Sequence, residues 1–298
     1  MDLDAVRAAC AEVARRSRWV RIDREAIPAY AAALPLAEFR PALDPDTHVL
    51  GDAGFILALD AVNFGSGYFP HLRKRDARSG YFHVARALKE RWPLTPAELA
   101  VIGVEDCRAI FGQPAEGPAA ELMELFAQAW NAFGRHLLEH HRGSYEALLE
   151  ASGFEAEALA GLLAEVPFFD DVHPYRGLTV PIYKRAQIAP ADLELSIGGF
   201  RGLERLTLFA DNLVPHVLHL DGVLAFDEVV AERIEREELL SSGSEEEVEM
   251  RACAVQAVEL IKAETGRTAM ELDHLLWNRG QGAEYKARPR PRCRSVFY

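Results

Sequence analysis

Apolar residues recur at helical spacing along much of the chain. From Leu3 to Val13 they follow one another at intervals of three and four residues, which predicts an amphipathic helix over residues 3–16. Residues 54–63 differ, because nearly every position is apolar and the one charged residue is Asp60. A helix that is apolar on all sides is typical of a protein interior. This stretch therefore predicts a buried helix that carries a carboxylate.

The same periodicity indicates further helices, which end at glycine, proline or serine-bearing turns. We expect one from a cap at Asp23 to about residue 34, and others at residues 81–92, 96–102, 119–141, 145–151, 156–164, 191–197, 226–240, 248–264 and 269–278. Short strands are expected at 19–22 and 178–182, an irregular segment at 168–176, and an extended, proline-bearing connection at 36–47. The pattern predicts a mainly helical protein with a minor β element. Since no repeat or internal boundary is evident, residues 1–298 are expected to form one compact unit.

Two charged residues lie in apolar surroundings. Lys184 follows Ile182-Tyr183, and Asp211 lies between Leu208-Phe209-Ala210 and Asn212-Leu213-Val214. Burying a charge without compensation costs several kcal/mol. Asp211 is therefore a helix N-cap, an ion-pair partner of Lys184 or Arg185, or a carboxylate held in a dry pocket for chemistry. Lys184 belongs to a solvated face, binds a phosphate as a point charge, or tunes the nearby carboxylate.

A second candidate for ligand binding is the predicted helix at 269–278. Asp273 and Trp277 are four residues apart, so a carboxylate and an indole project from the same helix face. This pair suits a planar ligand with a hydrogen-bond-donating edge; the alternative for Asp273 is simple solvent exposure. The aromatic, glycine-rich stretch at 63–70 is typical of loops that line pockets, because glycine lets the backbone approach a ligand closely.

The net charge narrows the classes of partner. Thirty-three basic residues stand against 46 acidic ones, which gives a formal charge of −13. Such a chain repels polyanions, so a general nucleic-acid binder is disfavoured and a small or positively charged substrate is favoured. The four cysteines are far apart and indicate reduced thiols in a cytoplasmic protein. The chain begins without the features of a secretory signal and contains no stretch long enough to span a membrane.

Familiar cofactor and metal motifs are missing from the sequence. There is no Walker loop, dinucleotide fingerprint or G-x-S-x-G elbow. His136 and His140 have the spacing of two ligands on one helix face, but no H-E-x-x-H motif or third ligand accompanies them. We therefore expect neither a cofactor nor a metal.

Five blocks of the sequence closely resemble the queuosine salvage family and occur in that family's order. They are Leu-Asp-Ala-Val-Asn-Phe at 59–64, Tyr-Lys-Arg-Ala-Gln-Ile at 183–188, Leu-Phe-Ala-Asp-Asn at 208–212 with Val-Pro at 214–215, Glu-Met-Arg-Ala at 249–252, and Leu-Asp at 272–273 with Trp277 and Arg-Gly at 279–280. The resemblance spans about residues 19–298. Members of the family are queuosine 5'-phosphate N-glycosylases, which release the base queuine for tRNA modification. Their fold is similar to that of helix-hairpin-helix DNA glycosylases.

The resemblance implies an enzyme that hydrolyses queuosine 5'-phosphate to queuine and ribose 5-phosphate, and it suggests roles for particular residues. Asp211 would be the catalytic carboxylate and Lys184 its catalytic partner, which we expect to bind phosphate or to tune Asp211 rather than to act as a nucleophile. Arg185 and His48 are the other candidate phosphate ligands, and Asp60 is a candidate partner for the amine of the base. The remaining implied substrate contacts are Phe209, Asp273 and Trp277 from matched blocks, and His48, Phe64 and Asn212 from positions near them.

Two rival functions remain open at this point. One is a DNA base-excision glycosylase of the same fold, and the other is a non-catalytic queuine-binding protein. The hairpin that DNA glycosylases place against the duplex is not recognisable, and its neighbourhood lacks a basic surface. The expected partner is therefore a small nucleotide rather than a nucleic-acid duplex, while the sequence leaves the oligomeric state open.

Overall fold

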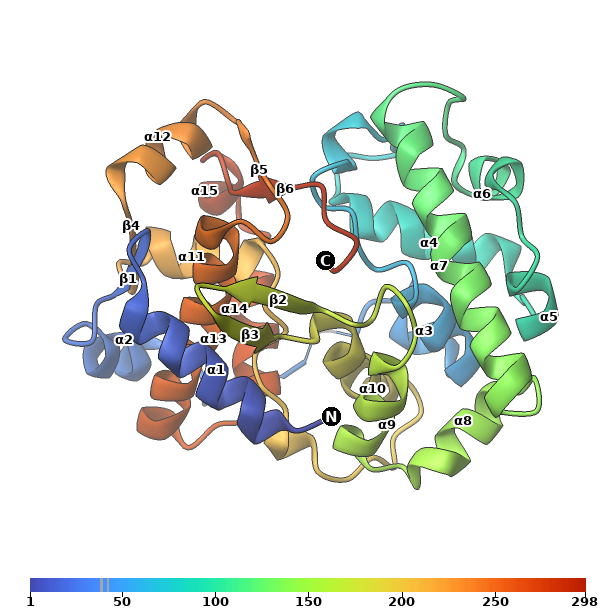
Figure 1. Ribbon diagram of the computed structural model, residues 1–298, viewed down its shortest axis with the longest axis horizontal. Helices are drawn as coiled ribbons and strands as arrows, with labels where there is room; N and C mark the ends of the chain where they lie inside the picture. Colours follow the sequence, from blue (N-terminus) through green and yellow to red (C-terminus); the bar gives the residue numbers. More distant parts are fainter. Residues whose placement is uncertain (38–39, 42) are drawn as a thin grey trace.

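The apolar positions of the chain gather into two hydrophobic cores. The computed structural model describes residues 1–37, 40–41 and 43–298, and Figure 1 shows the helices in two groups with α10 (Lys184–Ser196) near the middle. This helix joins the cores, because its Ala191 packs in the first and its Ala186 and Leu193 pack in the second. The start of α10 is therefore held from both sides.

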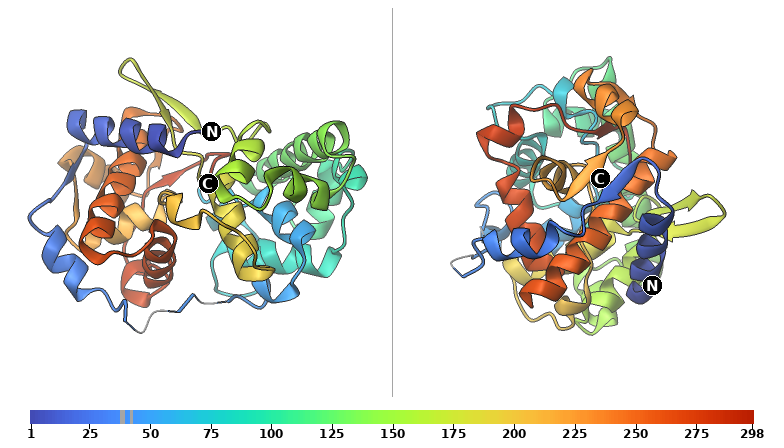
Figure 2. Two further views of the ribbon diagram at one scale, coloured as in Figure 1. Left: turned by 90° about the horizontal axis from the view of Figure 1, so that it is seen from below. Right: turned by 90° about the vertical axis from the view of Figure 1, so that its left-hand side faces the viewer.

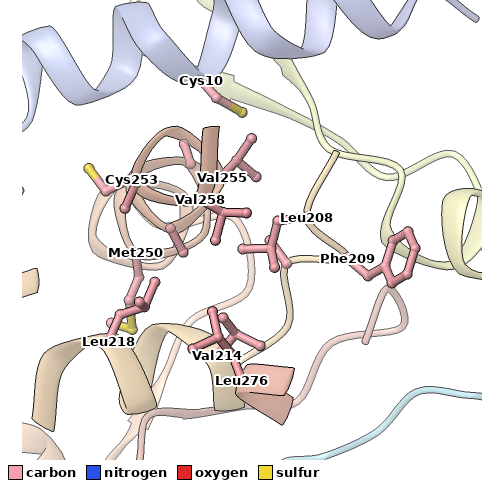
Figure 3. Packing of buried hydrophobic residues seen from close by; sticks show 14 of the residues in the cluster. Cys10, Leu208, Phe209, Val214, Leu218, Met250, Cys253, Val255, Val258 and Leu276 are labelled. Carbon is pink, nitrogen blue, oxygen red and sulfur yellow. The ribbon is translucent and has the colours of Figure 1, made fainter. Parts of the chain in front are cut away.

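The first core is built around the long helix α13, against which α1 packs. Asp2 caps α1 by accepting from the backbone N–H groups of Asp4 and Ala5, and the residues expected to face inward, among them Val6 and Cys10, are buried. Figure 3 shows Cys10 of α1 pointing toward α13, which carries Val255 and Val258. The helices of this core are α1 (Leu3–Arg16), α2 (Ile27–Ala33), α11 (Leu213–Leu220), α12 (Glu228–Glu235), α13 (Glu245–Thr265), α14 (Ala269–Arg279) and α15 (Ala283–Lys286).

The second core surrounds α3, the apolar helix predicted to be buried. Every residue of α3 from Gly54 to Asp60 is buried, which confirms that prediction. The helices of this core are α3 (Ala53–Asp60), α4 (Gly80–Arg91), α5 (Pro96–Leu99), α6 (Val104–Phe111), α7 (Pro118–His140), α8 (Tyr145–Ser152) and α9 (Ala156–Ala164). Short 3-10 turns occur at His48–Leu50, Phe69–His71 and Leu203–Arg205.

The β structure consists of short strand pairs. Among the described residues β1 (Val20–Ile22) pairs antiparallel with β4 (Leu224–Phe226), β2 (Val172–Tyr175) pairs antiparallel with β3 (Leu178–Pro181), and β5 (Leu239–Leu240) pairs in parallel with β6 (Arg292–Cys293). Figure 2 shows the β2–β3 hairpin projecting from the helices. The mainly helical class with a minor β element is thus confirmed, and the likeness to helix-hairpin-helix glycosylases stays a prediction.

Several local predictions were wrong or incomplete. Residues 168–176 were expected to be irregular, but Val172–Tyr175 is a strand that turns back through Gly177. The helix expected at 226–240 is shorter than predicted and lies between the strands β4 and β5. Asp227 caps the start of α12, and Glu237 takes a positive φ of 57° beyond its end. Three helices, α6, α11 and the short α15, were not predicted. The connection expected at 36–47 includes residues 38, 39 and 42, which lie outside the described residues.

The helix expected at 191–197 begins seven residues earlier than predicted, with Pro190 inside it. Proline is poorly tolerated in a helix interior, which is why the sequence alone favoured a later start. At the true start, the Asp171 carboxylate accepts the Lys184 N–H at 3.0 Å and satisfies a backbone donor that has no partner within the helix. A residue 13 positions away therefore decides where this helix begins.

The cysteines and helix lengths agree with the simplest expectations. All four cysteines are buried and unpaired, as expected of reduced thiols. None of the helices formed by the described residues combines the length and the apolar character needed to cross a bilayer.

Candidate active site

Side chains from both cores surround one cavity. Its wall is formed by the start of α10, one face of α14, the segment that precedes α11, the turn around His48, the loop at 63–66 and the start of α4. The lining residues are Leu43, Asp44, Pro45, His48, Asn63, Phe64, Ser66, Phe69, Ser79, Tyr81, Phe82, Lys184, Ile188, Asp192, Phe209, Asp211, Asn212, Leu213, Asp273, His274, Trp277, Asn278, Gln281, Arg290 and Tyr298. Of the residues predicted to form the site, all but Asp60 and Arg185 are in this wall.

Lys184 is a buried cation at the edge of a group of carboxylates. It is the first residue of α10 and is only 6% exposed, so the solvated-face interpretation is wrong. Burial lowers the pKa of Lys184, and the negative charges of Asp211, Asp60 and Asp273 only partly offset this. Its Nζ has no hydrogen-bond or salt-bridge partner among the described residues. The ammonium is therefore free to bind an anion in the cavity.

Asp211 combines two of the roles considered for it. Its Oδ1 accepts the backbone N–H groups of Leu213 at 2.7 Å and Val214 at 3.1 Å, at the N-terminus of α11. It also lines the cavity, and its Oδ2 accepts no hydrogen bond from the described part of the chain. Figure 3 shows the Leu208 and Phe209 side chains pointing in different directions; both belong to the first core, and Phe209 also lines the cavity. One carboxylate oxygen is thus fixed by the helix while the other stays free.

Asp273 is a second carboxylate in the wall, and it lacks a full set of partners. It is buried on α14, so the solvent-exposed alternative is wrong, and its Oδ1 has no hydrogen-bond partner in the described structure. Burial raises the pKa of Asp273 well above its usual range, and the charge of Asp211 adds to this effect. A buried oxygen without a partner is costly. We expect a ligand to supply the missing hydrogen bond.

The side chain of Trp277 lies one helical turn from Asp273 and is held by two aromatic rings. Its ring centroid is 5.9 Å from that of Tyr81 and 5.9 Å from that of Phe82, with interplanar angles of 80° and 62°. Edge-to-face contacts of this kind restrain a ring without covering both of its faces. Together with Phe209, the three rings give the cavity an aromatic wall suited to a planar base.

His48 lies opposite Asp192 in the wall. Its Nε2 is 3.4 Å from Asp192 Oδ1, and its Nδ1 accepts the backbone N–H of Asp44 at 3.1 Å. Burial would lower the pKa of His48, but the hydrogen bond and negative charge of Asp192 outweigh burial and raise it. The placement of His48 in the wall agrees with its predicted role as a substrate contact.

Asp60 is one of the two predicted site residues that do not line the cavity. It ends α3, where its Oδ1 accepts from Asn63 Nδ2 at 3.3 Å and its Oδ2 has no partner among the described residues. Burial raises the pKa of Asp60 well above its usual range, the charge of Asp192 adds to this, and the charge of Lys184 opposes it. The structure therefore places Asp60 behind Asn63, where it influences the cavity through charge.

The predicted contacts Phe64 and Asn212 are both in the wall. Phe64 packs edge-to-face on Phe126 and lies beneath Arg185. Asn212 donates from Nδ2 to the Pro291 carbonyl at 2.7 Å and so fixes the C-terminal segment beside the cavity. The loop at 63–70 is bound to the same segment, because Gly65 N–H donates to the Tyr298 carbonyl at 2.8 Å. Phe64 and Asn212 thus line the cavity and also make contacts that stabilise the fold around it.

Arg185 was a candidate phosphate ligand, and the structure argues against that role. It is not in the cavity wall, and its guanidinium donates to the backbone carbonyls of Asp60, Ala61, Phe168 and Val296. Its donors therefore join α3, the segment before β2 and the C-terminal segment rather than face the cavity.

Arg290 is a cavity cation that sequence analysis missed. It lines the wall, and burial lowers its pKa although the charge of Asp211 opposes this. It has no hydrogen-bond or salt-bridge partner in the described chain. Arg290 is in a tail rich in proline and arginine, and nothing in the neighbouring sequence distinguishes it from the other arginines as a cavity residue.

Sequence analysis also missed Asp192 as a cavity residue, although its spacing from Lys184 indicates this position. Lys184, Ile188 and Asp192 follow one another at four-residue spacing on α10 and all line the cavity. A helix that starts at Lys184 predicts this shared face, whereas one that starts at residue 191 does not.

No set of three or more His, Cys, Asp or Glu side chains within the described ranges is arranged to hold a metal ion. In particular, His136, His140 and His141 lie near one another on α7 and at its end, yet they do not form such a set.

The chain is similar to proteins of one family. A protein-family model described as "Queuosine salvage protein" matches residues 43–298. The chain is similar to a protein of Sphaerobacter thermophilus named "Queuosine 5'-phosphate N-glycosylase/hydrolase", with 35% identity over 96% of this chain and 95% of that protein. It is also similar to proteins of the same name from Mus musculus, at 29% identity over 96% of each chain, and from Dictyostelium discoideum, at 30% identity over 83% of this chain and 78% of that protein.

Proposed function

This chain belongs to the queuosine salvage protein family, and we propose that it hydrolyses the N-glycosidic bond of queuosine 5'-phosphate to give queuine and ribose 5-phosphate. The observation that carries the proposal is the placement of Asp211, which faces the cavity with one oxygen fixed by two backbone N–H groups. Around it lie the buried Lys184, the half-buried Arg290 and an aromatic wall with an unpartnered carboxylate. These groups correspond to the three parts of a nucleotide.

The sugar is the part at which charge develops. Cleavage of a ribosyl bond passes through an oxocarbenium-like state, which a carboxylate in a low-dielectric cavity stabilises more than water does. The free Oδ2 of Asp211 is the group for this task, because Oδ1 is already engaged by Leu213 and Val214. In the direct route a water molecule gives hydroxide to C1' and its proton to the departing base. In the alternative route the Asp211 carboxylate displaces the base to form a glycosyl ester, and water then hydrolyses this ester, with the released proton neutralising the base.

The base is held by α14 and the aromatic wall. Queuine is a 7-deazaguanine, so it has no N7 to protonate, and its departure depends on contacts to its carbonyl and amine edge. Asp273 Oδ1 accepts from the N–H groups of that edge, which supplies the hydrogen bond it lacks. Trp277 and Phe209 stack on the ring.

The amine of the base side chain carries positive charge and needs an anionic neighbour. Asp60 remains the candidate named from the sequence, acting from behind Asn63. Asp192 lies nearer to the ligand, because it is in the cavity wall. We assign the direct contact to Asp192 and a longer-range charge effect to Asp60.

The 5'-phosphate requires a cation. Lys184 and Arg290 both line the cavity near Asp211, and neither has a partner of its own among the described residues. Phosphate oxygens accept charge-assisted hydrogen bonds from both residue types. We assign the phosphate to these two residues, with His48 as a further candidate.

Incubation of the protein with queuosine 5'-phosphate tests the proposal, with chromatography for queuine and ribose 5-phosphate. Asp211→Asn should lose at least about 100-fold in kcat, since loss of one stabilising group of this kind costs that much. Asparagine keeps an oxygen for the Leu213 and Val214 N–H groups, so the fold should persist. Product formation by Asp211→Asn at the wild-type rate would contradict the mechanism.

The same assay separates the rival functions. A queuine-binding protein would bind the base without turnover, and a DNA glycosylase would shift duplex DNA at low salt and be trapped through Lys184. The acidic chain disfavours duplex DNA. Because the site draws residues from both cores, it supports the proposal that residues 1–298 form one functional unit. The four unpaired cysteines support a location in the reducing cytoplasm.

A further inference from the structure

Behind the cavity, Asp171 and Arg251 form a buried bidentate ion pair. Arg251 Nη2 lies 2.6 Å from Asp171 Oδ2, and Arg251 Nη1 lies 2.9 Å from Asp171 Oδ1. Each side chain is 1% exposed, and neither lines the cavity. Burial would raise the pKa of Asp171, but the charge of Arg251 outweighs it and holds that pKa well below its usual range. The pair is therefore ionised and lies outside the reach of substrate.

Asp171 holds the backbone that leads into Lys184. Its carboxylate Oδ2 accepts the Lys184 N–H at 3.0 Å, and its backbone carbonyl accepts from Ile182 at 2.9 Å and Tyr183 at 3.3 Å. Tyr183 has a φ of 53°, a left-handed conformation that is strained for a residue with a side chain. Such a conformation persists where surrounding contacts enforce it. Asp171 supplies those contacts.

Arg251 holds the backbone that leads into Asp211. Its Nε donates to the Ala210 carbonyl at 2.9 Å, directly before the catalytic carboxylate. The two segments meet at a second point, where Gln187 donates to the Ile182 carbonyl at 2.8 Å and accepts the Thr207 N–H at 2.8 Å. The ion pair is thus the connection nearest to the two catalytic residues.

We propose that Asp171 and Arg251 are positioning residues that set the distance and orientation of Lys184 relative to Asp211 in the reaction. They act through backbone hydrogen bonds at both ends of one rigid ion pair. A catalytic group displaced by about 1 Å costs on the order of 100-fold in rate. The base-binding residues Asp273 and Trp277 lie on α14, to which the pair makes no hydrogen bond in the described chain, whereas Phe209 adjoins the restrained Ala210. The affinity for free queuine should therefore fall much less than kcat.

The test compares kcat per queuine-binding site with the affinity for queuine. Asp171→Asn keeps the size of the side chain but removes the charge, and Arg251→Lys keeps the charge but loses the fork that reaches both Asp171 and Ala210. We expect kcat to fall about 100-fold in each, with the dissociation constant of queuine within about threefold of wild type. Normalising to titrated queuine sites removes any loss caused by unfolded protein.

Glu249→Gln is the matched control. Glu249 is on the same helix, is also fully buried, and holds the backbone N–H groups of Arg18, Trp19 and Val20, none of which leads to the cavity. Its normalised kcat should stay within about threefold of wild type even if its melting temperature falls. The positioning role is wrong if the normalised kcat of Arg251→Lys equals that of Glu249→Gln. It is also wrong if the affinity for queuine falls by the same factor as kcat.

This inference rests on the proposed hydrolysis, and the two can fail separately. A wild-type protein that does not cleave queuosine 5'-phosphate refutes the hydrolysis. A wild-type protein that cleaves it, with Arg251→Lys as active as wild type, refutes only the positioning role. Because removing one partner of a buried pair is strongly destabilising, Asp171→Asn could fail to fold; Arg251→Lys, which keeps both charges, then decides the question.

Discussion

His48 Nε2 and Asp192 Oδ1 lie 3.4 Å apart in the cavity wall, so a histidine and a carboxylate from distant segments share a hydrogen bond in a largely dry site. This contact reverses the change that burial alone would make to the pKa of the His48 imidazole. Burial lowers the pKa of His48, whereas Asp192 raises it above the ordinary value of 6.5. The charge state of the cavity near neutral pH therefore depends on this pair.

Asp192→Asn should lower the pKa of His48 below its wild-type value. Because the folded-state pKa in the wild type is raised, protonation of His48 contributes stability that is fully present below pH 6.5 and is lost as the pH rises through the folded-state value. The variant should lose that contribution. An NMR titration of the His48 ring proton measures the shift, and His216, which is bonded to the Tyr285 carbonyl, is the internal control. An unchanged His48 titration would contradict the assigned cause.

Lys184→Met should discriminate between nucleotide and nucleoside. Losing a charged hydrogen bond to phosphate should raise the KM for queuosine 5'-phosphate by about 10- to 100-fold, with little change for queuosine. Since burial lowers the pKa of Lys184, removing the charge should not reduce the melting temperature at pH 7. The comparison with Arg290→Met shows which cation carries more of the phosphate binding. Equal losses for nucleotide and nucleoside would indicate that Lys184 acts on Asp211 instead.

Trp277→Ala should weaken queuine binding. Stacking of a base on an aromatic side chain contributes about 1–3 kcal/mol, which corresponds to roughly a 10- to 100-fold rise in the dissociation constant. Calorimetry with free queuine measures this, and Trp277→Phe should recover most of the affinity. Trp92 packs on Phe55 away from the cavity, so Trp92→Phe is the control. Wild-type affinity in Trp277→Ala would place the base elsewhere.

Asp60→Asn should stabilise the empty protein at neutral pH. Asp60 has a raised folded-state pKa, so it favours folding below its unfolded value of about 3.8 and loses that contribution as the pH rises through the folded-state value. The melting temperature of the variant should therefore exceed that of wild type by several degrees at pH 7–8, and the difference should vanish near pH 3.8. A gain that does not change with pH would point to packing rather than charge.

The strongly periodic helices could be predicted from the sequence because their evidence is local. The spacing of Leu3, Val6, Cys10 and Val13 gave the bounds of α1, and the apolar run of α3 gave its burial. The start of α10 could not be predicted in this way. It depends on Asp171, a distant acceptor for the Lys184 N–H, and on a proline that the surrounding packing tolerates.

For the site, the sequence by itself determined which residue types were out of keeping with their surroundings: charge in an apolar segment made Lys184 and Asp211 candidates, and the spacing of Asp273 and Trp277 added a second pair. Only the tertiary structure decided how such groups are used. It brought Asp192 to His48 and Arg290 near Asp211, turned Arg185 away to backbone carbonyls, and set Asp60 behind the wall. The physical reason is that apolar neighbours along the chain show where burying a charge costs free energy. The groups that compensate this charge come from segments far apart in the sequence, and only packing brings them together.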